Sequence, residues 1–198
     1  MNGFDAVTHA MSTIATGGFA NYDSSFGVYQ ERPQLLWFSS FFMLLAAMPL
    51  ILFVAMAKGQ RRALLNDPQV RFFLLLVGLC TAILTFYQVE YDQRSPFEAL
   101  THSVLNVISI ITTCGYASED YTQWGNLAIM MFFYITFAGA CSGSTSGGLK
   151  IFRIQLSALM LVKQLHLLIH PNAVWTPRYA GRAIDDALLG SILAFCFI

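Results

Sequence analysis

Thr112-Thr113-Cys114-Gly115-Tyr116 is the stretch that decides how this 198-residue chain folds. It follows a short apolar segment and precedes the acidic pair Glu119-Asp120. Glycine permits backbone torsions that other residues avoid, so an irregular loop is expected here. A similar block stands earlier in the chain, because Thr16-Gly17-Gly18-Phe19-Ala20 corresponds to Thr113-Cys114-Gly115-Tyr116-Ala117. The stretch is therefore one copy of a repeated feature.

The repeat extends into the segment before each block. Ala6-Val7-Thr8-His9-Ala10 recurs as Ala99-Leu100-Thr101-His102-Ser103, and the second copy is four residues longer between its two blocks, about one helical turn. An internal repeat names the building unit of a fold. The predicted unit is an outer helix, a short pore helix that enters the membrane without crossing it, a Thr/Gly loop and an inner helix.

The composition is that of an integral membrane protein. Hydrophobic residues make up 56% of the chain and charged residues 11%, against roughly 25% charged residues in soluble domains. Such a surface belongs in a lipid bilayer, and a net charge of zero gives no sign of a nucleic-acid partner. The four cysteines lie in apolar or Gly-rich stretches without a CxxC pair, so they are expected to be small buried residues and not a disulfide framework.

Two long uncharged runs predict membrane crossings. Residues 35–57 and 72–89 are each long enough, since about 20 apolar residues suffice for one crossing. Pro49 lies inside the first run and is expected to kink it, which neighbouring helices tolerate.

The second half of the chain contains a short helix and a broken one. Residues 97–111 are too short and too polar for a crossing, and Ser95-Pro96 before them is typical of a helix start. Residues 124–149 form a further uncharged run, which is broken in its second half and continues as a helix over residues 154–169.

Charges fix the predicted orientation. Lysine and arginine gather on one side of the crossings, at Lys58, Arg61, Arg62, Arg71, Lys150, Arg153, Lys163, Arg178 and Arg182. Acidic residues gather on the other side, at Asp23, Glu31, Glu90, Asp92, Glu98, Glu119 and Asp120. The positive-inside rule makes the first side cytoplasmic, so both Thr/Gly loops face outward. Asp23, Glu119 and Asp120 are then either solvated surface charges or a negative field that concentrates cations at the outer mouth.

The unit divides the chain into three parts. Residues 1–66 are expected to be the end of one copy, residues 67–170 a complete copy, and residues 171–198 a cytoplasmic connection followed by the start of another outer helix. The chain begins inside a pore element and ends inside an apolar run, which predicts a fragment of a longer protein.

The Thr/Gly loops are similar to the carbonyl loop TVGYG of potassium channels, whose backbone oxygens replace the hydration shell of the ion. The candidate potassium ligands are backbone carbonyls of Ala15, Thr16, Gly17, Gly18, Thr112, Thr113, Cys114 and Gly115. One loop cannot surround an ion, so several units must meet on one axis. Potassium is thus the expected substrate, and no organic cofactor is expected.

A Gly/Ser-rich segment, residues 139–148, interrupts the third uncharged run and is called here the Gly/Ser loop. Small flexible residues at mid-membrane depth favour a hydrated loop that obstructs the pore when closed. The candidate gate residues are Gly139, Cys141, Ser142, Gly143, Ser144, Thr145, Ser146, Gly147, Gly148 and Lys150. The alternative is helix packing, because Gly139, Gly143 and Gly147 are spaced as a double GxxxG. Cys141 also stands where a nucleophile elbow would have its nucleophile, but no catalytic partners accompany it, so the chain is not expected to be an enzyme.

Three motifs together closely resemble the TrkH/KtrB superfamily of potassium transporters, and its bacterial TrkH members in particular. They are Ala15-Thr16-Gly17-Gly18-Phe19, Thr112-Thr113-Cys114-Gly115-Tyr116 and the segment from Gly139 through Lys150. The resemblance covers essentially the whole chain, as the end of a second repeat, a third repeat and the start of a fourth. It implies an all-helical membrane fold of four channel-like units around one pore, with Gly18 and Gly115 as the retained filter glycines.

The resemblance also carries the expected assembly and activity. It implies potassium uptake, a homodimer in the bacterial inner membrane, a cytosolic nucleotide-binding regulatory ring, and a gate at the Gly/Ser loop. Whether transport is channel-like or a symport with protons or sodium stays open.

Four histidines leave a second function open. His9 and His102 occupy equivalent positions in the two copies, where hydrogen bonds that anchor each pore helix are the favoured interpretation. His166 and His170 have i, i+4 spacing near a cytoplasmic helix end. The alternative is a redox membrane subunit that uses these histidines to bind haem, which a Soret band would reveal.

Overall fold

The structure, a computed structural model, describes residues 1–60, 62–170, 177–184 and 190–191. Its elements are, in chain order, α1 (Gly3–Ile14), η1 (Ser25–Tyr29), α2 (Pro33–Ala46), α3 (Leu50–Ala57), α4 (Ala63–Asn66), α5 (Pro68–Tyr91), α6 (Pro96–Ile111), η2 (Tyr121–Trp124), α7 (Asn126–Phe137), α8 (Ile151–Ile169), β1 (Arg178–Tyr179) and β2 (Arg182–Ala183). The strands pair antiparallel as a two-residue hairpin. The helices predicted at residues 72–89, 97–111 and 154–169 are present, whereas η1, α4, η2 and this hairpin were not predicted.

Some predictions lie outside the described residues. They concern Arg61, Cys196 and those parts of residues 171–198 that lie outside 177–184 and 190–191.

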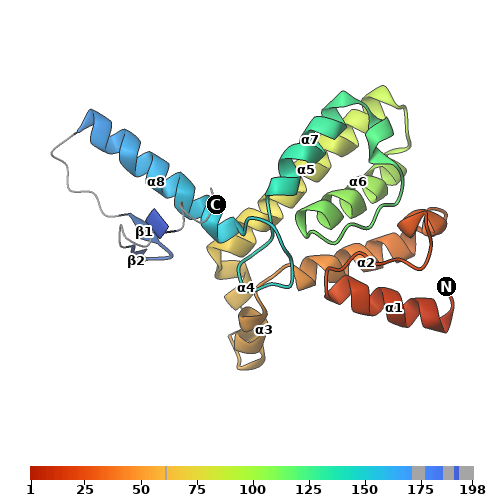
Figure 1. Cartoon of the computed structure of the whole chain (residues 1–198), viewed down its shortest axis with the longest axis horizontal. Helices are drawn as coiled ribbons and strands as arrows, with labels where there is room; N and C mark the ends of the chain where they lie inside the picture. Colours follow the sequence, from red (N-terminus) through yellow and green to blue (C-terminus); the bar gives the residue numbers. More distant parts are fainter. Residues whose placement is uncertain (61, 171–176, 185–189, 192–198) are drawn as a thin grey trace.

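The short helix α6 lies at the centre of the helix bundle (Figure 1). It packs on α5 along one side and on α2 along the other, and α1 packs on α2. Leu105, Ile108 and Ile111 of α6 are at most 1% exposed, as are Phe73 and Leu84 of α5. Each such buried side chain contributes about 1.5–3 kcal/mol relative to leaving it in water. The helix predicted at residues 97–111 is therefore confirmed, and protein covers it.

Both α5 and α6 begin at a residue that caps the helix. The side chain of Ser95 accepts a hydrogen bond from the Glu98 backbone N–H at 3.4 Å. Asp67 accepts from the backbone N–H groups of Gln69 and Val70, at 2.8 and 3.2 Å. Each cap is followed by proline, whose fixed φ and missing N–H suit the first helical position. The run predicted at residues 72–89 is confirmed as a helix, which starts earlier, at Pro68, and ends at Tyr91.

The crossing predicted at residues 35–57 is not one continuous helix. α2 and α3 meet at an angle of 88° around Pro49. Proline removes an N–H donor and clashes with the preceding turn, so the helix ends there. The Gly/Ser loop binds the backbone groups that the bend leaves free: Cys141 N donates to Ala47 O (3.2 Å), Thr145 N to Ala46 O (3.4 Å) and Leu50 N to Gly143 O (3.1 Å).

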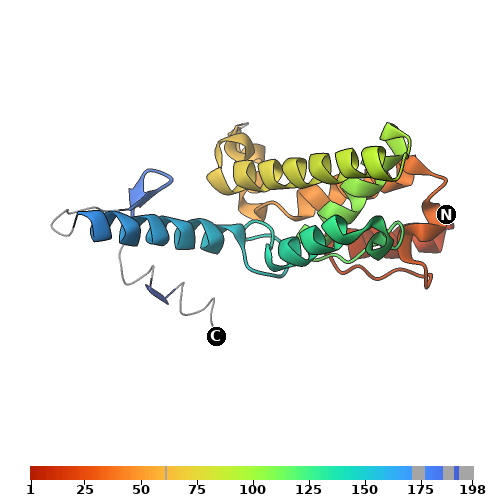
Figure 2. The same cartoon turned by 90° about the horizontal axis from the view of Figure 1, so that it is seen from above.

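Among the described residues, α5 and α8 are each long and apolar enough to cross a membrane, and the bent α2–α3 pair makes up to three such spans. α7 has 12 residues and ends at the Gly/Ser loop, after which α8 continues for 19 residues. α8 extends away from the other helices (Figure 2), and its Leu161, Leu165 and Leu168 are exposed. An exposed apolar helix of this length suits a lipid environment.

Candidate functional site: two Thr/Gly loops and the loop beneath them

The two Thr/Gly loops have the same backbone conformation. Ala15 and Thr112, the residues that directly follow α1 and α6, have φ of −77° and −79°. The next residue is left-handed in both copies, with φ of 49° at Thr16 and 56° at Thr113. Two residues later φ is again positive, 67° at Gly18 and 95° at Gly115, whereas the residue between them is not left-handed. The two loops thus share the same irregular, non-helical backbone, which a carbonyl-lined ion site requires.

The same hydrogen bonds hold both loops to their helices. Ser12 O accepts from Gly17 N at 2.8 Å, and the equivalent Ser109 O accepts from Cys114 N at 2.9 Å. In the second copy Ser109 Oγ also accepts from Gly115 N at 3.1 Å. The sequence comparison did not single out these serines, although they occupy equivalent positions when the two Thr/Gly blocks are aligned.

The two loops touch through their backbones. A Cβ atom added at Gly18 would lie 1.7 Å from the carbonyl oxygen of Cys114 and 2.7 Å from its carbonyl carbon. A Cβ atom at Gly115 would meet nothing within 4 Å. The repeated loops, about 97 positions apart in the chain, are thus brought side by side, and Gly18 leaves no room for a side chain.

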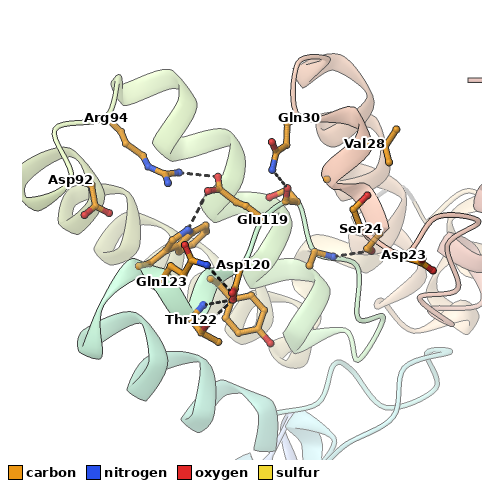
Figure 3. Close-up of a pocket in the computed structure, with 16 residues that line it drawn as sticks. Asp23, Ser24, Val28, Gln30, Asp92, Arg94, Glu119, Asp120, Thr122 and Gln123 are labelled. Atoms are coloured by element: carbon orange, nitrogen blue, oxygen red, sulfur yellow. Dashed lines mark hydrogen bonds and ion pairs between the residues drawn. The ribbon is translucent and has the colours of Figure 1, made fainter.

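The segment after the second loop is fixed to the first copy. Tyr116 is buried, its ring lies 4.2 Å from that of Phe26, and its hydroxyl donates to His9 O at 3.4 Å. Ser118 O accepts from the Gln30 side chain at 2.6 Å, and Ser25 Oγ accepts from Ala117 N at 3.2 Å (Figure 3). These contacts set the position of one loop relative to the other.

An open pocket of about 1000 Å³ lies among the segments that follow the two Thr/Gly loops, and Figure 3 shows it. Four carboxylates line it, those of Asp23, Asp92, Glu119 and Asp120. Arg94 is also in the lining and binds Glu119. The acidic residues predicted to gather at an outer mouth therefore line one pocket, which supports a field that attracts cations.

Glu119 is the most firmly held of these carboxylates. Its side chain is 18% exposed, and Oε1 lies 2.8 Å from Arg94 Nη1 and 2.9 Å from His102 Nδ1. A carboxylate only accepts hydrogen bonds, so the second contact places a proton on Nδ1. Burial raises the pKa of Glu119, but the hydrogen bonds from His102 and Arg94 outweigh it and lower the pKa to about 2.

The depressed pKa of Glu119 predicts a loss of stability in acid. A carboxylate whose folded pKa is below its unfolded value stabilises the fold fully above the unfolded value, here 4.5, and loses that contribution as pH falls toward about 2. We expect the contribution to be about 1–2 kcal/mol in this open pocket. Thermal unfolding of the intact protein in detergent should show that Glu119→Gln lowers Tm at pH 6, and that the gap to the wild type narrows below pH 4.5. Asp23→Asn, at an exposed acid of the same pocket, should leave Tm unchanged; a constant gap for Glu119→Gln would contradict the assignment.

The Gly/Ser loop has an irregular backbone, and hydrogen bonds join its two ends. These ends, residues 139–140 and 149–151, are called the neck of the loop. Gly139 N donates to Leu149 O at 2.7 Å, and Ile151 N donates to Ala140 O at 3.1 Å. Gly143 and Gly148 are left-handed, with φ of 80° and 69°. The helix-packing alternative is wrong, because the three glycines of the double GxxxG are not in a helix.

The Gly/Ser loop contacts both Thr/Gly loops through equivalent threonines. Thr145 Oγ1 donates to Ile14 O at 3.2 Å and lies 3.4 Å from Thr16 Oγ1. Gly147 N donates to Thr113 Oγ1 at 2.7 Å. Gln69 of α5 holds the same loop by accepting from Ser142 N at 2.9 Å. A hydrogen-bonded contact of this kind lets one segment close beneath both filter candidates. Thr145 was among the predicted gate residues, whereas Gln69 was not predicted.

The remaining gate candidates form a small polar cluster. Ser144 Oγ lies 2.9 Å from Ser146 Oγ and donates to Cys141 O at 2.7 Å. The Lys150 ammonium binds Ser144 and Ser146. All predicted gate residues thus lie in, or directly bind, one loop.

The histidines are placed differently in the two copies. His102 Nδ1 lies 2.8 Å from Ser118 Oγ, so His102 ties α6 to the segment after the filter loop, as predicted. His9 Nδ1 lies 2.7 Å from Asp5 O in its own helix, so this bond anchors α1 to nothing else. The rings of His166 and His170 lie 5.2 Å apart at the end of α8.

These features define a class: helical membrane proteins in which two short helices end in paired irregular Thr/Gly loops. The chain belongs to the TrkH family of cation transport proteins, whose family pattern it matches over residues 1–198. This family is one of potassium transporters and not of enzymes, so the predicted family and the predicted absence of enzymatic activity are both confirmed.

Several relatives are similar over 98–100% of this chain. The Trk system potassium uptake protein TrkI of Halomonas elongata is 50% identical over 198 residues, which cover 100% of this chain and 40% of that protein. TrkH of Escherichia coli strain K12 is 31% identical over 200 residues, covering 98% of this chain and 41% of that protein. The crystal structure of the potassium transporter TrkH from Vibrio parahaemolyticus matches with a TM-score of 0.92 and 31% identity, over 98% of this chain and 42% of that one. The chain spans about two fifths of the length of these relatives.

Proposed function

We propose that this chain forms part of a potassium uptake pathway, in which backbone carbonyls of residues 15–18 and 112–115 supply part of a selectivity filter. The observation that carries this proposal is the matching alternation of backbone handedness in the two adjacent loops. The relatives are named potassium uptake proteins, which favours potassium as the ion. Selectivity then arises from the number and field strength of the carbonyl oxygens around the ion.

The assembly that completes the pathway is also part of the proposal. Two loops cannot surround an ion, so further units of the same kind complete the filter. The intact protein acts as a homodimer in the bacterial inner membrane and is regulated by a cytosolic nucleotide-binding ring. Residues 1–66 and 67–170 are the end of one unit and the whole of the next, and residues 171–198 lead to another.

The Gly/Ser loop serves as the gate in this proposal. Its hydrogen bonds to Thr113, to Ile14 and to the bend between α2 and α3 support a closed position beneath the filter. Most of these bonds involve neutral partners, each with a net value of about 0.5–1.5 kcal/mol. A modest shift in free energy therefore suffices to release the loop.

The experiment that tests the proposed function is rubidium uptake into liposomes that contain the intact protein, beside a Gly115→Ser variant. A side chain at Gly115 meets nothing within 4 Å, so the variant is expected to fold, but its φ of 95° strains any residue with a Cβ. The strain is of the order of 1–3 kcal/mol and acts directly on the filter carbonyls. We expect potassium-selective uptake by the wild type and loss of selectivity over sodium in the variant.

The matched control is Gly78→Ser. Gly78 lies within α5 and also has open space around its Cβ position, but its φ is not positive. This control should retain selectivity. A wild type that moves no cation, or a Gly115→Ser variant as selective as the wild type, would refute the filter assignment. Within the described residues no observation favours the haem alternative, and a Soret band in the intact protein would revive it.

A further inference from the structure

Lys150 is bound by neutral oxygens of the Gly/Ser loop. Its Nζ atom lies 3.3 Å from Ser144 Oγ and 3.2 Å from Ser146 Oγ, and it also donates to Ser146 O. Among the described residues, no carboxylate lies within 4 Å of the Lys150 ammonium. Within residues 1–60, 62–170 and 177–184, the groups that stabilise this ammonium are therefore oxygen dipoles.

This arrangement is the one that a small monovalent cation requires. A primary ammonium has three donors and no acceptor, and it is a compact point charge. Serine hydroxyls and a backbone carbonyl are the ligands that also replace the hydration shell of an alkali cation. Ser146 is buried and Ser144 and Lys150 are half-buried, so a charge here is costly unless oxygens surround it.

The position of this oxygen cluster relates it to the ion path. The same loop binds the first Thr/Gly loop through Thr145 and the second through Gly147. Ser144 and Ser146 flank the first of these contact residues, Thr145, in the sequence, and both bind the Lys150 ammonium. An ion that leaves the filter toward the cytoplasm would meet this loop next.

We propose that Ser144 Oγ, Ser146 Oγ and Ser146 O form a monovalent-cation site that the Lys150 ammonium fills in this conformation. Lys150 is a tethered competitor: while it occupies the site, no free potassium ion can bind there, and a conducting loop must release it. The inference rests on the proposed function, because it places the site on the potassium pathway.

The test is thallium binding and rubidium flux in the intact protein and its Lys150→Ala variant. Thallium(I) replaces potassium and gives an anomalous diffraction signal. We expect a thallium peak beside Ser144 and Ser146 in crystals of Lys150→Ala and none there in the wild type. Rubidium uptake should rise roughly tenfold, which corresponds to a loss of about 1.4 kcal/mol in the free energy that favours the closed loop.

Chemical rescue separates a tethered cation from a structural lysine. n-Propylammonium carries the three carbons and the ammonium that Lys150→Ala removes, so millimolar amounts on the cytoplasmic side should return rubidium uptake to the wild-type level. Lys150→Met keeps the stem and leaves no room for the added amine, so its raised uptake should be insensitive to n-propylammonium. Lys163→Ala, which removes a positive charge elsewhere on α8, should behave as the wild type.

The outcomes distinguish this inference from the proposed function. If the wild type is potassium-selective, but Lys150→Ala shows no thallium peak at the serines and no block by n-propylammonium, the tethered-cation inference is wrong and the filter assignment stands. If the wild type moves no rubidium, the proposed function fails first. A thallium peak of equal height in the wild type would also overturn the inference, because Lys150 would then not occupy the site.

Discussion

Gly18→Ala is expected to abolish potassium uptake and to reduce the amount of folded protein. The added methyl group would lie 1.7 Å from the Cys114 carbonyl oxygen, a distance that no relaxation of a side chain can relieve because the neighbour is backbone. The φ of 67° adds strain of the order of 1–3 kcal/mol. Since the collision pushes apart the two loops that form the filter candidate, selectivity and stability should be lost together.

Two further variants separate the collision from other effects. At Gly115 the φ is positive but the space around the Cβ position is open. Gly115→Ala should therefore lose less thermal stability than Gly18→Ala, while still losing selectivity. Gly17→Ala has no positive φ and meets first the Phe19 ring at 3.2 Å, which can move, so it should be the mildest of the three. The measurements are Tm in detergent and rubidium uptake per folded molecule. Wild-type uptake by Gly18→Ala would show that the two loops do not touch in the working protein.

Gly139→Ala is expected to produce a leaking transporter. Its Cβ atom would lie 2.6 Å from Gly147 O and 2.9 Å from Leu149 O, both backbone atoms across the neck of the Gly/Ser loop. The neck must widen, which breaks the 2.7 Å hydrogen bond from Gly139 N to Leu149 O and pulls Gly147 away from Thr113. A loop displaced from the filter candidate should raise basal potassium flux several-fold without changing ion selectivity.

The control for Gly139→Ala is Gly143→Ala in the same loop. That variant places a Cβ atom 3.9 Å from Pro49, an ordinary contact, and bears only the strain of a φ of 80°. It should leak less than Gly139→Ala. Flux is read as rubidium uptake in liposomes without added regulatory components, with selectivity measured against sodium. Equal basal flux in the wild type and Gly139→Ala would mean that the neck does not hold the gate closed.

Much of the fold could be predicted because membrane segments and repeats leave strong local signals. Residues 72–89 and 97–111 were recognised from the length and polarity of their runs, and both are helices. The equivalence of Thr16 and Thr113 followed from the repeat and is matched by their φ values of 49° and 56°. Glycines at positions 18 and 115 were expected to need unusual torsions, and both have positive φ.

The features that the sequence left open, or misjudged as at His9, depend on contacts between distant segments. Pro49 predicts a kink, but the 88° bend between α2 and α3 persists because the Gly/Ser loop binds the backbone groups that the bend frees. The glycines at 139, 143 and 147 fit a packed helix by spacing alone, and only the fold shows that they lie in a loop. His9 and His102 are equivalent in sequence, yet their hydrogen bonds differ because only His102 has Glu119 and Ser118 beside it.

The sequence by itself determined that this chain is a helical membrane protein built from a repeated pore-loop unit, since composition and periodicity report the local environment of each residue. Only the tertiary structure decided that Gly18 touches Cys114, that Thr145 and Gly147 join the Gly/Ser loop to both filter candidates, and that Lys150 lies among serine oxygens. The physical reason is that these contacts join backbone and side-chain atoms of separately formed elements. Their distances depend on how helices pack, which no local pattern of residues specifies.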